Sequence, residues 1–402
     1  MKKHILVITQ YFYPEQFRIN DICSEWVKRG YKVTVITGIP NYPQGKYYIG
    51  YGLFKKRKEN LEGIDIIRIP LIPRGHNAIM LVLNYISFVI SGLIWKLTTK
   101  IKADYVFIFE VSPMTQALPG VWYAKRRKIP CYLYVQDLWP ENVEIITGIK
   151  NKFAIGLIGK MVDYIYKRCT KIFTTSESFV KSISDRGVPI EKLIYWPQFA
   201  EDFYEPLEKK KVDEIPEDDC FNIIFAGNIG VAQGLDILAN AAELIKKISN
   251  KKIRFNIVGD GRYKTTLVDL IDVKGVSNMF NFIPKQPATR MSELMAANDA
   301  AFLSLTDSYL FEMTIPAKLQ SYMACGIPII ASAAGETERI IINSESGVCS
   351  KPGNAEELSM KILEIANMRS EELKQLGANA RYYCENNFCK NILLDHMDQY
   401  LM

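Results

Sequence analysis

The sequence predicts an α/β fold with two domains, each built around a largely parallel sheet. Short apolar strands alternate with helical segments along the 402 residues, and the pattern restarts after residue 220. A charged, proline-containing stretch over 205–219 lies between the two runs and has little to bury, so we interpret it as a linker. These observations favour two doubly wound, Rossmann-like domains.

The first half contains six predicted strands and an amphipathic helix near its start. The helix is expected over 17–30, with apolar residues on one face, and Gly30 is expected to end it. The strands are predicted over 4–9, 32–37, 64–69, 105–109, 131–135 and 171–175.

The second half repeats the alternation. Its helices are expected over 234–248, 289–298, 317–325 and 355–368, and its strands over 221–226, 253–258, 279–283, 300–305, 327–331 and 347–349.

Composition and charge limit the classes of function. Residues 1–200 hold 29 Lys and Arg against 15 Asp and Glu, whereas the rest hold 21 against 29. The basic clusters at 55–58 and 125–128 suit phosphate-bearing partners or an anionic membrane surface, although solvated surface lysines are an equal alternative. No recognition-helix, zinc-finger or RNA-binding pattern accompanies this charge, so nucleic acid is not expected as a partner.

The cysteines and the N-terminus favour a cytoplasmic protein. Eight scattered cysteines without a C-x-x-C pair predict reduced thiols, and they suggest no metal site with the three histidines. The first residues run directly into a strand without a signal-peptide pattern, so export is not expected.

One apolar segment, 79–97, could be taken for a membrane span. Three interpretations are open: a helix that spans the bilayer, a buried helix that covers the sheet, and a helix partly dipped into the membrane interface. Spanning is disfavoured because the strands on either side of the segment belong to one predicted sheet.

The carboxyl ends of parallel strands are where open sheets bind ligands. After strand 221–226 the chain offers a glycine-rich turn directly before a helix, a suitable site for a diphosphate, although such a turn can also be a tight connection. Its candidate ligand contacts are Gly227, Asn228, Gly230 and Gln233.

Other polar residues follow the later strands of this half. Lys318 lies in a first helical turn that Pro316 begins, where it could reach a phosphate or be a solvated helix lysine. The remaining candidates, placed where a nucleoside could lie, are Gly259, Asp260, Gly261, Arg262, Lys285 and Gln286.

Three polar-aromatic loops follow strands of the first half, and we expect them at one sheet edge. Their candidate residues are Glu15, Arg18, Asn41, Tyr42, Gln136, Asp137, Trp139 and Glu141. No G-x-G-x-x-G follows the first strand, no Asp-x-Asp pair suggests a metal clamp, and no G-x-S-x-G is present. Nicotinamide and flavin enzymes and covalent hydrolases are therefore disfavoured.

Taken together, these motifs resemble the family 4 glycosyltransferases of the GT-B fold, in which two Rossmann-like domains face a central cleft. Within that family they look most like the WbuB-like transferases of capsule and O-antigen synthesis, which are of the fucosamine-transferase type. The motifs span the chain, at 11–15 with Arg18, 37–43, 137–141, 196–204, 226–230, 258–261 and 323–328.

The resemblance implies a retaining, metal-independent transfer without a cofactor from a nucleotide-sugar donor such as a UDP-sugar. The domain at 221–379 would bind the donor, the one at 1–200 the acceptor, and a helix from about residue 380 to 402 would return to the first domain after the linker at 201–220. Catalysis would rest on positioning and on stabilising the departing diphosphate. Asp137, Lys318 and Glu312 are the expected catalytic residues, Ser321 joins the donor contacts, and the first-half loops become acceptor contacts.

The chain also departs from the family pattern. Asn228 and Gln233 stand where many relatives carry Arg and Lys, so Lys318, Arg262 or Arg290 would have to balance the diphosphate. The paired glutamates of the family fall near Met313 and at Ser321, with Glu312 adjacent. Gln136 replaces a histidine that faces the 6-position of the sugar, which fits a 6-deoxy sugar such as an N-acetylfucosamine.

Two other functions stay open at this point: a nucleotide-sugar epimerase or hydrolase of the same fold, and a non-catalytic partner subunit. The basic first half and the segment 79–97 add the expectation that the acceptor is a polyprenyl-diphosphate-linked sugar. A protein that uses this acceptor would be cytoplasmic and peripheral on the inner face of the membrane.

Overall fold

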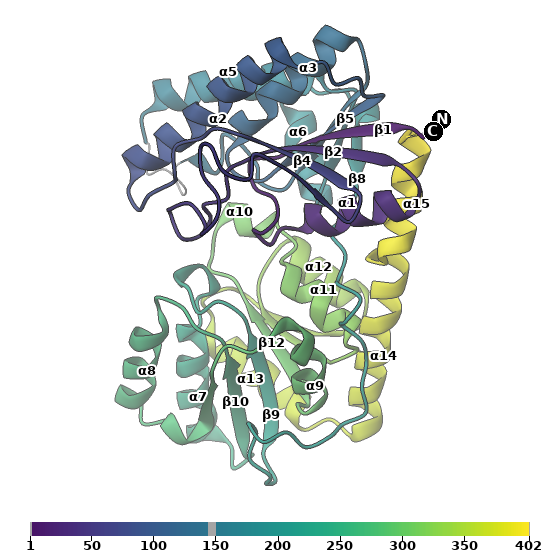
Figure 1. Ribbon diagram of the computed structural model, residues 1–402. Coiled ribbons are helices and arrows are strands. Elements are labelled where there is room, and N and C mark those ends of the chain that lie inside the picture. Colours follow the sequence, from purple (N-terminus) through teal and green to yellow (C-terminus); the bar gives the residue numbers. More distant parts are fainter. Residues whose placement is uncertain (1, 144–149, 402) are drawn as a thin grey trace. The chain divides into compact units, whose positions relative to one another are not determined.

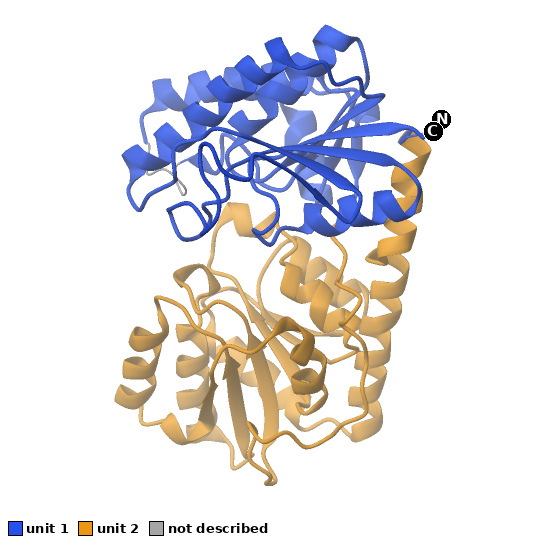
Figure 2. Cartoon of the chain, in the orientation of Figure 1, with its two compact units in different colours: residues 1–196, 401 blue, residues 197–400, 402 orange. Residues whose placement is uncertain are grey.

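The computed structural model, which describes residues 2–143 and 150–401, confirms two Rossmann-like α/β domains. The chain divides into two compact units, one ending at Trp196 with Leu401 added, and the other running from Pro197 to Tyr400 (Figure 2). We call these unit 1 and unit 2. The division falls shortly before the stretch 201–220 that was interpreted as a linker.

Unit 1 contains a sheet of eight strands in the order β3-β4-β2-β1-β5-β6-β7-β8 (Figure 1). Only β3, at the edge, runs antiparallel to its neighbour, as expected for a sheet built from strand-helix-strand units. The strands are β1 (His4–Ile8), β2 (Lys32–Gly38), β3 (Lys58–Leu61), β4 (Ile64–Ile69), β5 (Tyr105–Glu110), β6 (Cys131–Val135), β7 (Lys171–Thr174) and β8 (Leu193–Tyr195).

Helices cover both faces of this sheet. Trp26 of α1 (Arg18–Lys28) packs edge-on against Phe107 of β5, whereas Gly120 of α3 (Leu118–Arg127) lies against Ile108, the next residue of the same strand. Because successive strand residues point to opposite faces, α1 and α3 cover opposite sides. The helices α2 (Ala78–Thr98) and α5 (Lys152–Arg168) lie beside α3 (Figure 1), and α6 (Glu177–Asp185) contacts β7 and β8.

Unit 2 contains a fully parallel sheet of six strands in the order β11-β10-β9-β12-β13-β14. The strands are β9 (Phe221–Ala226), β10 (Ile253–Val258), β11 (Phe280–Ile283), β12 (Ala300–Ser304), β13 (Ile329–Ser332) and β14 (Gly347–Ser350). The helices are α7 (Asp236–Ile248), α8 (Lys264–Val273), α9 (Met291–Ala296), α10 (Tyr309–Glu312), α11 (Ala317–Ala324), α12 (Glu336–Asn343), α13 (Ala355–Ala366), α14 (Ser370–Asn387) and α15 (Lys390–Leu401).

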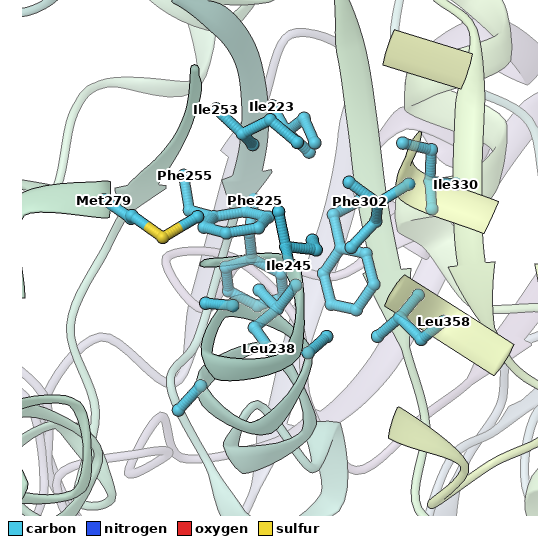
Figure 3. Packing of buried hydrophobic residues seen from close by; sticks show 14 of the residues in the cluster. Ile223, Phe225, Leu238, Ile245, Ile253, Phe255, Met279, Phe302, Ile330 and Leu358 are labelled. Atoms are coloured by element: carbon cyan, nitrogen blue, oxygen red, sulfur yellow. The ribbon is translucent and has the colours of Figure 1, made fainter. Parts of the chain in front are cut away.

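One hydrophobic core of unit 2 lies between the sheet and the helices α7 and α13. Phe225, Phe255 and Phe302 come from three neighbouring strands and point into the same layer, where Leu238 of α7 and Leu358 of α13 meet them (Figure 3). All five side chains are almost completely buried. This packing fixes the strands whose carboxyl ends carry the predicted diphosphate site.

The opposite face of the same sheet carries an asparagine ladder. Asn256 of β10 is paired with Asn281 of β11, and Asn222 lies on the neighbouring strand β9, two residues before the partner of Asn256. The side-chain amide of Asn256 donates to Asn222 at 3.1 Å and to Asn298 at 2.8 Å, and its oxygen accepts from Asn281 at 2.9 Å. Asn256 is fully buried, so these bonds replace its contacts with water.

Most predicted elements are present with ends shifted by one or two residues, but the end of the chain differs from the prediction. A single helix was expected from about residue 380, whereas α14 begins at Ser370 and ends at Asn387, before α15 starts at Lys390. Phe388, whose ring is buried, has a non-helical backbone with φ −123° and ψ 16° and interrupts the helix. The short strands β3 and β8 were not predicted, because neither has a long apolar run.

Replacing Asn256 by Leu should destabilise unit 2. The substitution keeps the branched shape of the side chain but leaves the side-chain amides of Asn222, Asn281 and Asn298 without this partner, so we expect a loss of about 2–4 kcal/mol in the free energy of unfolding. Urea denaturation followed by circular dichroism measures it. The control Asn386→Ala, on an exposed face of α14, should change stability by less than about 0.5 kcal/mol. Equal effects of the two substitutions would contradict the role of the ladder.

Candidate functional site

The loops after β9 and β10 are interlocked through their backbones. The amide of Gly227 donates to the carbonyl of Val258, and the amide of Ile229 donates to that of Asp260, both at 2.9 Å. A Cβ atom on Gly259 would lie 2.0 Å from the carbonyl oxygen of Gly227, and one on Gly261 would lie 2.1 Å from that of Ile229. Only glycine fits at these two positions, so the close approach of the two loops requires both glycines of the Gly-Asp-Gly pattern.

The rest of the glycine-rich turn is held from within and from β12. The side-chain oxygen of Gln233 accepts from the amide of Gly230 at 3.1 Å. Gln233 was predicted to contact the nucleotide-sugar, but its oxygen is already bonded inside the turn. The carbonyl of Ala232 accepts from the amide of Thr306, which follows β12. Gly234 has a φ of +54°, and the turn leads directly into α7. The loops after three adjacent strands therefore form one connected edge.

Lys318 lies against this turn. It is the second residue of α11, which begins after Pro316, and its Cε atom lies 2.5 Å from the position that a Cβ on Gly227 would take. Gly227 has a φ of +144°, which also favours glycine. The Nζ atom lies 3.8 Å from the centre of the Phe225 ring. The structure thus brings together the two parts of the predicted diphosphate site, residues 227–234 and Lys318.

The environment of Lys318 disfavours its charge in the absence of an anion. Burial lowers the pKa of Lys318 from its usual value to about 7. Across the described residues, no carboxylate lies within ion-pair distance of its Nζ atom. A bound anion at this place would restore the balance by favouring the protonated lysine.

The other predicted donor residues are less closely gathered. Arg290, which was expected to help balance the diphosphate, is instead paired with Glu214 and Glu293, and it also donates to Gln286. The hydroxyl of Ser321 donates to the carbonyl of Ala317 one turn earlier in its own helix. Asp260 accepts from the amide of Gly261, and Asn228 lies close to Gly230, whereas Arg262, Lys285 and Glu312 are exposed.

Glu15 joins two loops of unit 1. Its carboxylate accepts from the amides of Asn41 at 2.8 Å, Tyr42 at 2.7 Å and Phe12 at 3.2 Å, and only 2% of the residue is exposed. Burial raises the pKa of Glu15 to about 7, although these amides act in the opposite direction. Glu15 was predicted to contact the acceptor, but in this structure it positions the loops after β1 and β2.

Those loops present aromatic and basic side chains. The rings of Tyr11, Phe17 and Tyr42 pack together with centroids 5.3 to 5.6 Å apart, and the Arg74 guanidinium lies 5.2 Å from the centre of the Tyr42 ring. Asn41 is buried, and its side-chain oxygen accepts from the amide of Arg74. Arg18, also predicted at this edge, lies 3.9 Å from Asp21.

Asp137 is held by a small network at the ends of β5 and β6. Its Oδ2 atom accepts from the amide of Ser112 at 2.8 Å and from the Ser112 hydroxyl at 2.7 Å. The indole of the buried Trp139 donates to the same hydroxyl at 3.1 Å. No hydrogen bond from the described residues reaches the Oδ1 atom, which leaves it able to accept from a ligand.

A second carboxyl group lies beneath Asp137. Glu110 is the last residue of β5, it is fully buried, and neither side-chain oxygen has a hydrogen-bond partner among the described residues. Burial, followed by the charge of Asp137, raises the pKa of Glu110 well above its usual range. Burial therefore favours the neutral form of Glu110. Gln136 donates its backbone amide to the carbonyl of Glu110, and Glu141 is partly buried nearby in the chain.

Several of these residues were not identified from the sequence. Glu110 and Ser112 follow β5, and Gly335 follows β13, so the strand-end rule could have found them. Gly335 has a φ of +67°, and a Cβ there would lie 2.1 Å from the carbonyl oxygen of Glu312. The side-chain oxygen of Asn84 accepts from Gln10 inside unit 1. In the sequence, the only indication of this role was that Asn84 is a polar residue in an otherwise apolar helix.

The described residues contain no group of three or more His, Cys, Asp or Glu side chains that could hold a metal ion. Metal independence was expected from the lack of an Asp-x-Asp pair and from the family resemblance, and it stays a prediction.

Comparison with known proteins shows which proteins the chain resembles. Residues 207–383 match the family model described as "Glycosyl transferases group 1". WcaI of Escherichia coli strain K12, provisionally named a colanic acid biosynthesis glycosyl transferase, is 25% identical over 352 residues, which cover 83% of this chain and 84% of WcaI.

Two solved structures share the whole fold. Sucrose-phosphate synthase from Thermosynechococcus elongatus has a TM-score of 0.75 at 15% identity, covering 100% of this chain and 98% of that one. Anabaena Alr3699/HepE in complex with UDP has a TM-score of 0.71 at 14% identity, covering 100% and 99%. The chain is therefore a glycosyltransferase of the GT-B fold, and its residues 207–383 are similar to the group 1 glycosyl transferases.

Proposed function

We propose that this glycosyltransferase moves a sugar from a UDP-sugar to a polyprenyl-diphosphate-linked sugar during synthesis of a capsule or O-antigen polysaccharide. The transfer retains the configuration of the sugar and needs no metal ion. The observation on which this proposal rests is the position of Lys318 against the Gly227 turn. Support for the donor also comes from the UDP bound by Alr3699/HepE, and support for the product class comes from the name of WcaI.

In this proposal unit 2 binds the diphosphate of the donor. The turn at residues 227–234 follows a strand and precedes a helix, an arrangement that favours an anion. Lys318 then stabilises the negative charge that develops on the diphosphate as the bond to the sugar breaks. Because Arg290 is already paired, Lys318 is the cation that contributes most at this edge.

Unit 1 binds the acceptor through the loops after β1, β2 and β6. Asp137 is the proposed carboxylate at the acceptor, since its Oδ2 atom is fixed by Ser112 and its Oδ1 atom can accept a hydrogen bond from a hydroxyl. The raised pKa of the buried Glu110 disfavours a second negative charge beside it. Gln136 supports an N-acetylated 6-deoxy amino sugar as the group transferred.

A screen for products tests the function directly. Purified protein is incubated with single UDP-sugars and membranes that carry lipid-linked intermediates, with EDTA present, and the products are identified by mass. The proposal predicts one acceptor extended by one sugar. Conversion of the donor without an acceptor would indicate an epimerase or hydrolase, and no product with any sugar would favour a non-catalytic subunit.

Replacing Lys318 by Ala should weaken donor binding. The substitution removes a charge-assisted contact with the diphosphate, so we expect the dissociation constant for a UDP-sugar to rise about 10- to 100-fold. Isothermal calorimetry in EDTA measures it, with Lys361→Ala on α13 as the control. Unchanged affinity in Lys318→Ala would place the diphosphate elsewhere.

Donor binding should also depend on pH through Lys318. In the free protein the pKa of Lys318 is about 7, so above this pH the lysine loses its proton, and the diphosphate must restore it on binding. The affinity should fall as pH rises from about 7 to about 9, by at most roughly tenfold per pH unit. Calorimetry in buffers with different ionisation enthalpies should show proton uptake in the wild type and none in Lys318→Ala. Equal uptake in both proteins would assign the proton to another group.

Replacing Asp137 by Asn should slow transfer without affecting donor binding. The carboxylate is lost from the acceptor side, so kcat should fall about 100-fold or more, while the affinity for the UDP-sugar stays the same because Asp137 belongs to unit 1. Asp185→Asn, on the exposed end of α6, serves as the control. Full turnover by Asp137→Asn would remove this residue from the site.

A further inference from the structure

The helix α2 is apolar on two faces, and only one of them is used by the fold. The inner face carries Leu81, Phe88 and Trp95, all buried. Trp95 stacks on Tyr123 of α3 with centroids 5.4 Å apart, and Gly92 touches Pro119 so closely that a Cβ would lie 2.3 Å from its ring. This face fixes α2 along its length against unit 1.

The outer face of α2 is an uninterrupted apolar stripe. At 100° per residue its members fall within a sector of about 100° on the helix. The stripe extends for about 27 Å at 1.5 Å per residue. Its side chains are between 39% and 74% exposed, and they are Ile79, Leu83, Ile86, Ile90, Leu93, Ile94 and Leu97. An exposed patch of this kind on a soluble unit indicates an interaction surface.

The helices α2 and α3 carry positive charge only. Neither contains an Asp or Glu, whereas α3 ends in Lys125, Arg126 and Arg127. The guanidinium of Arg126 donates to the carbonyls of Lys96 and Leu97, so the basic end of α3 lies at the C-terminal end of the stripe. Lys100, one residue after the C-cap of α2, is also exposed.

The neighbouring helix α5 also combines exposed apolar side chains with a lack of acidic residues in its first part. The indole of Trp122 on α3 donates to the hydroxyl of Tyr164 on α5, so the two helices are neighbours. α5 exposes Phe153 and Leu157 and carries no acidic residue before Asp163. An apolar stripe on a helix without carboxylates, bordered by the cations of α3, matches an anionic lipid surface, with acyl chains below and phosphates above.

We propose that the outer face of α2 docks unit 1 onto an anionic lipid bilayer, with the helix lying in the plane of the headgroups. This inference goes beyond the proposed sugar transfer and does not depend on it. A second copy of the chain is the less suitable occupant, because two such surfaces would bring their basic ends together without carboxylates to balance them.

The contacts of α2 exclude a spanning orientation. The helix is long and apolar enough to cross a membrane by length and composition. However, the side-chain amide of Asn84 donates to the carbonyl of Ile72, its oxygen accepts from Gln10, and Ser87 accepts from the amide of Ile72. These bonds attach the middle of α2 to the loops after β1 and β4, which would have to enter the bilayer with it.

Flotation with lipid vesicles tests the surface in the full-length protein. The wild type should float at low salt with vesicles of equal parts phosphatidylglycerol and phosphatidylcholine, and less with phosphatidylcholine alone or at high salt. The double variant Ile86→Asp/Ile90→Asp should lower the partition coefficient about tenfold or more. Its matched control is Met360→Asp on α13, because Met360 is 59% exposed and Ile90 is 54% exposed.

Further measurements distinguish lipid docking from loss of folding and from self-association. An Ile90→Trp variant should show fluorescence quenched by brominated lipids, a signal that loss of folding would not produce. Binding of a UDP-sugar should be the same in all variants, so failure of the proposed function would not be confused with failure to dock. The proposal is overturned if the wild type does not float, if the double variant floats equally well, or if the stripe proves to join two copies in the absence of lipid.

Discussion

The structure depends on a lysine that is held against a glycine turn without a carboxylate partner among the described residues. Lys318 occupies space that a side chain at residue 227 would fill, and burial lowers its pKa to about 7. Such a group is costly in an empty site and becomes favourable when an anion arrives. In the proposed function this lysine leaves unit 2 prepared for the diphosphate of the donor, and glycosyl transfer follows when the bond between that diphosphate and the sugar breaks.

This preparation is set by backbone contacts. Gly259 and Gly261 let the loop after β10 approach the loop after β9 until carbonyl oxygens occupy the places of their missing side chains. Thr306 attaches the loop after β12 to the same edge. A sheet whose strands are fixed by the phenylalanine core and the asparagine ladder thus presents a rigid set of amides. In unit 1, by contrast, side chains such as Glu15 and Ser112 position the loops.

Much of this could be predicted from the sequence, because alternation of apolar runs determines the strands and the strand-end rule finds the polar loops. That reasoning identified the Gly227 turn, Lys318 and Asp137. It did not find the asparagine ladder, the raised pKa of Glu110 or the pairing of Arg290, since each depends on contacts between distant segments. The break at Phe388 was missed for the same reason, because the ring is buried by tertiary packing and neither glycine nor proline marks the place. The three interpretations of segment 79–97 could be separated only when both faces of α2 were seen.

Unit 1 combines the proposed acceptor loops with the lipid-facing stripe of α2, which fits an acceptor that is itself anchored in a membrane. The most direct test concerns the diphosphate site of unit 2, and a crystal structure of the protein with UDP provides it. We predict that the diphosphate contacts the turn at residues 227–234 and the Nζ atom of Lys318. A diphosphate bound away from both, with Lys318 still against Phe225, would contradict this account.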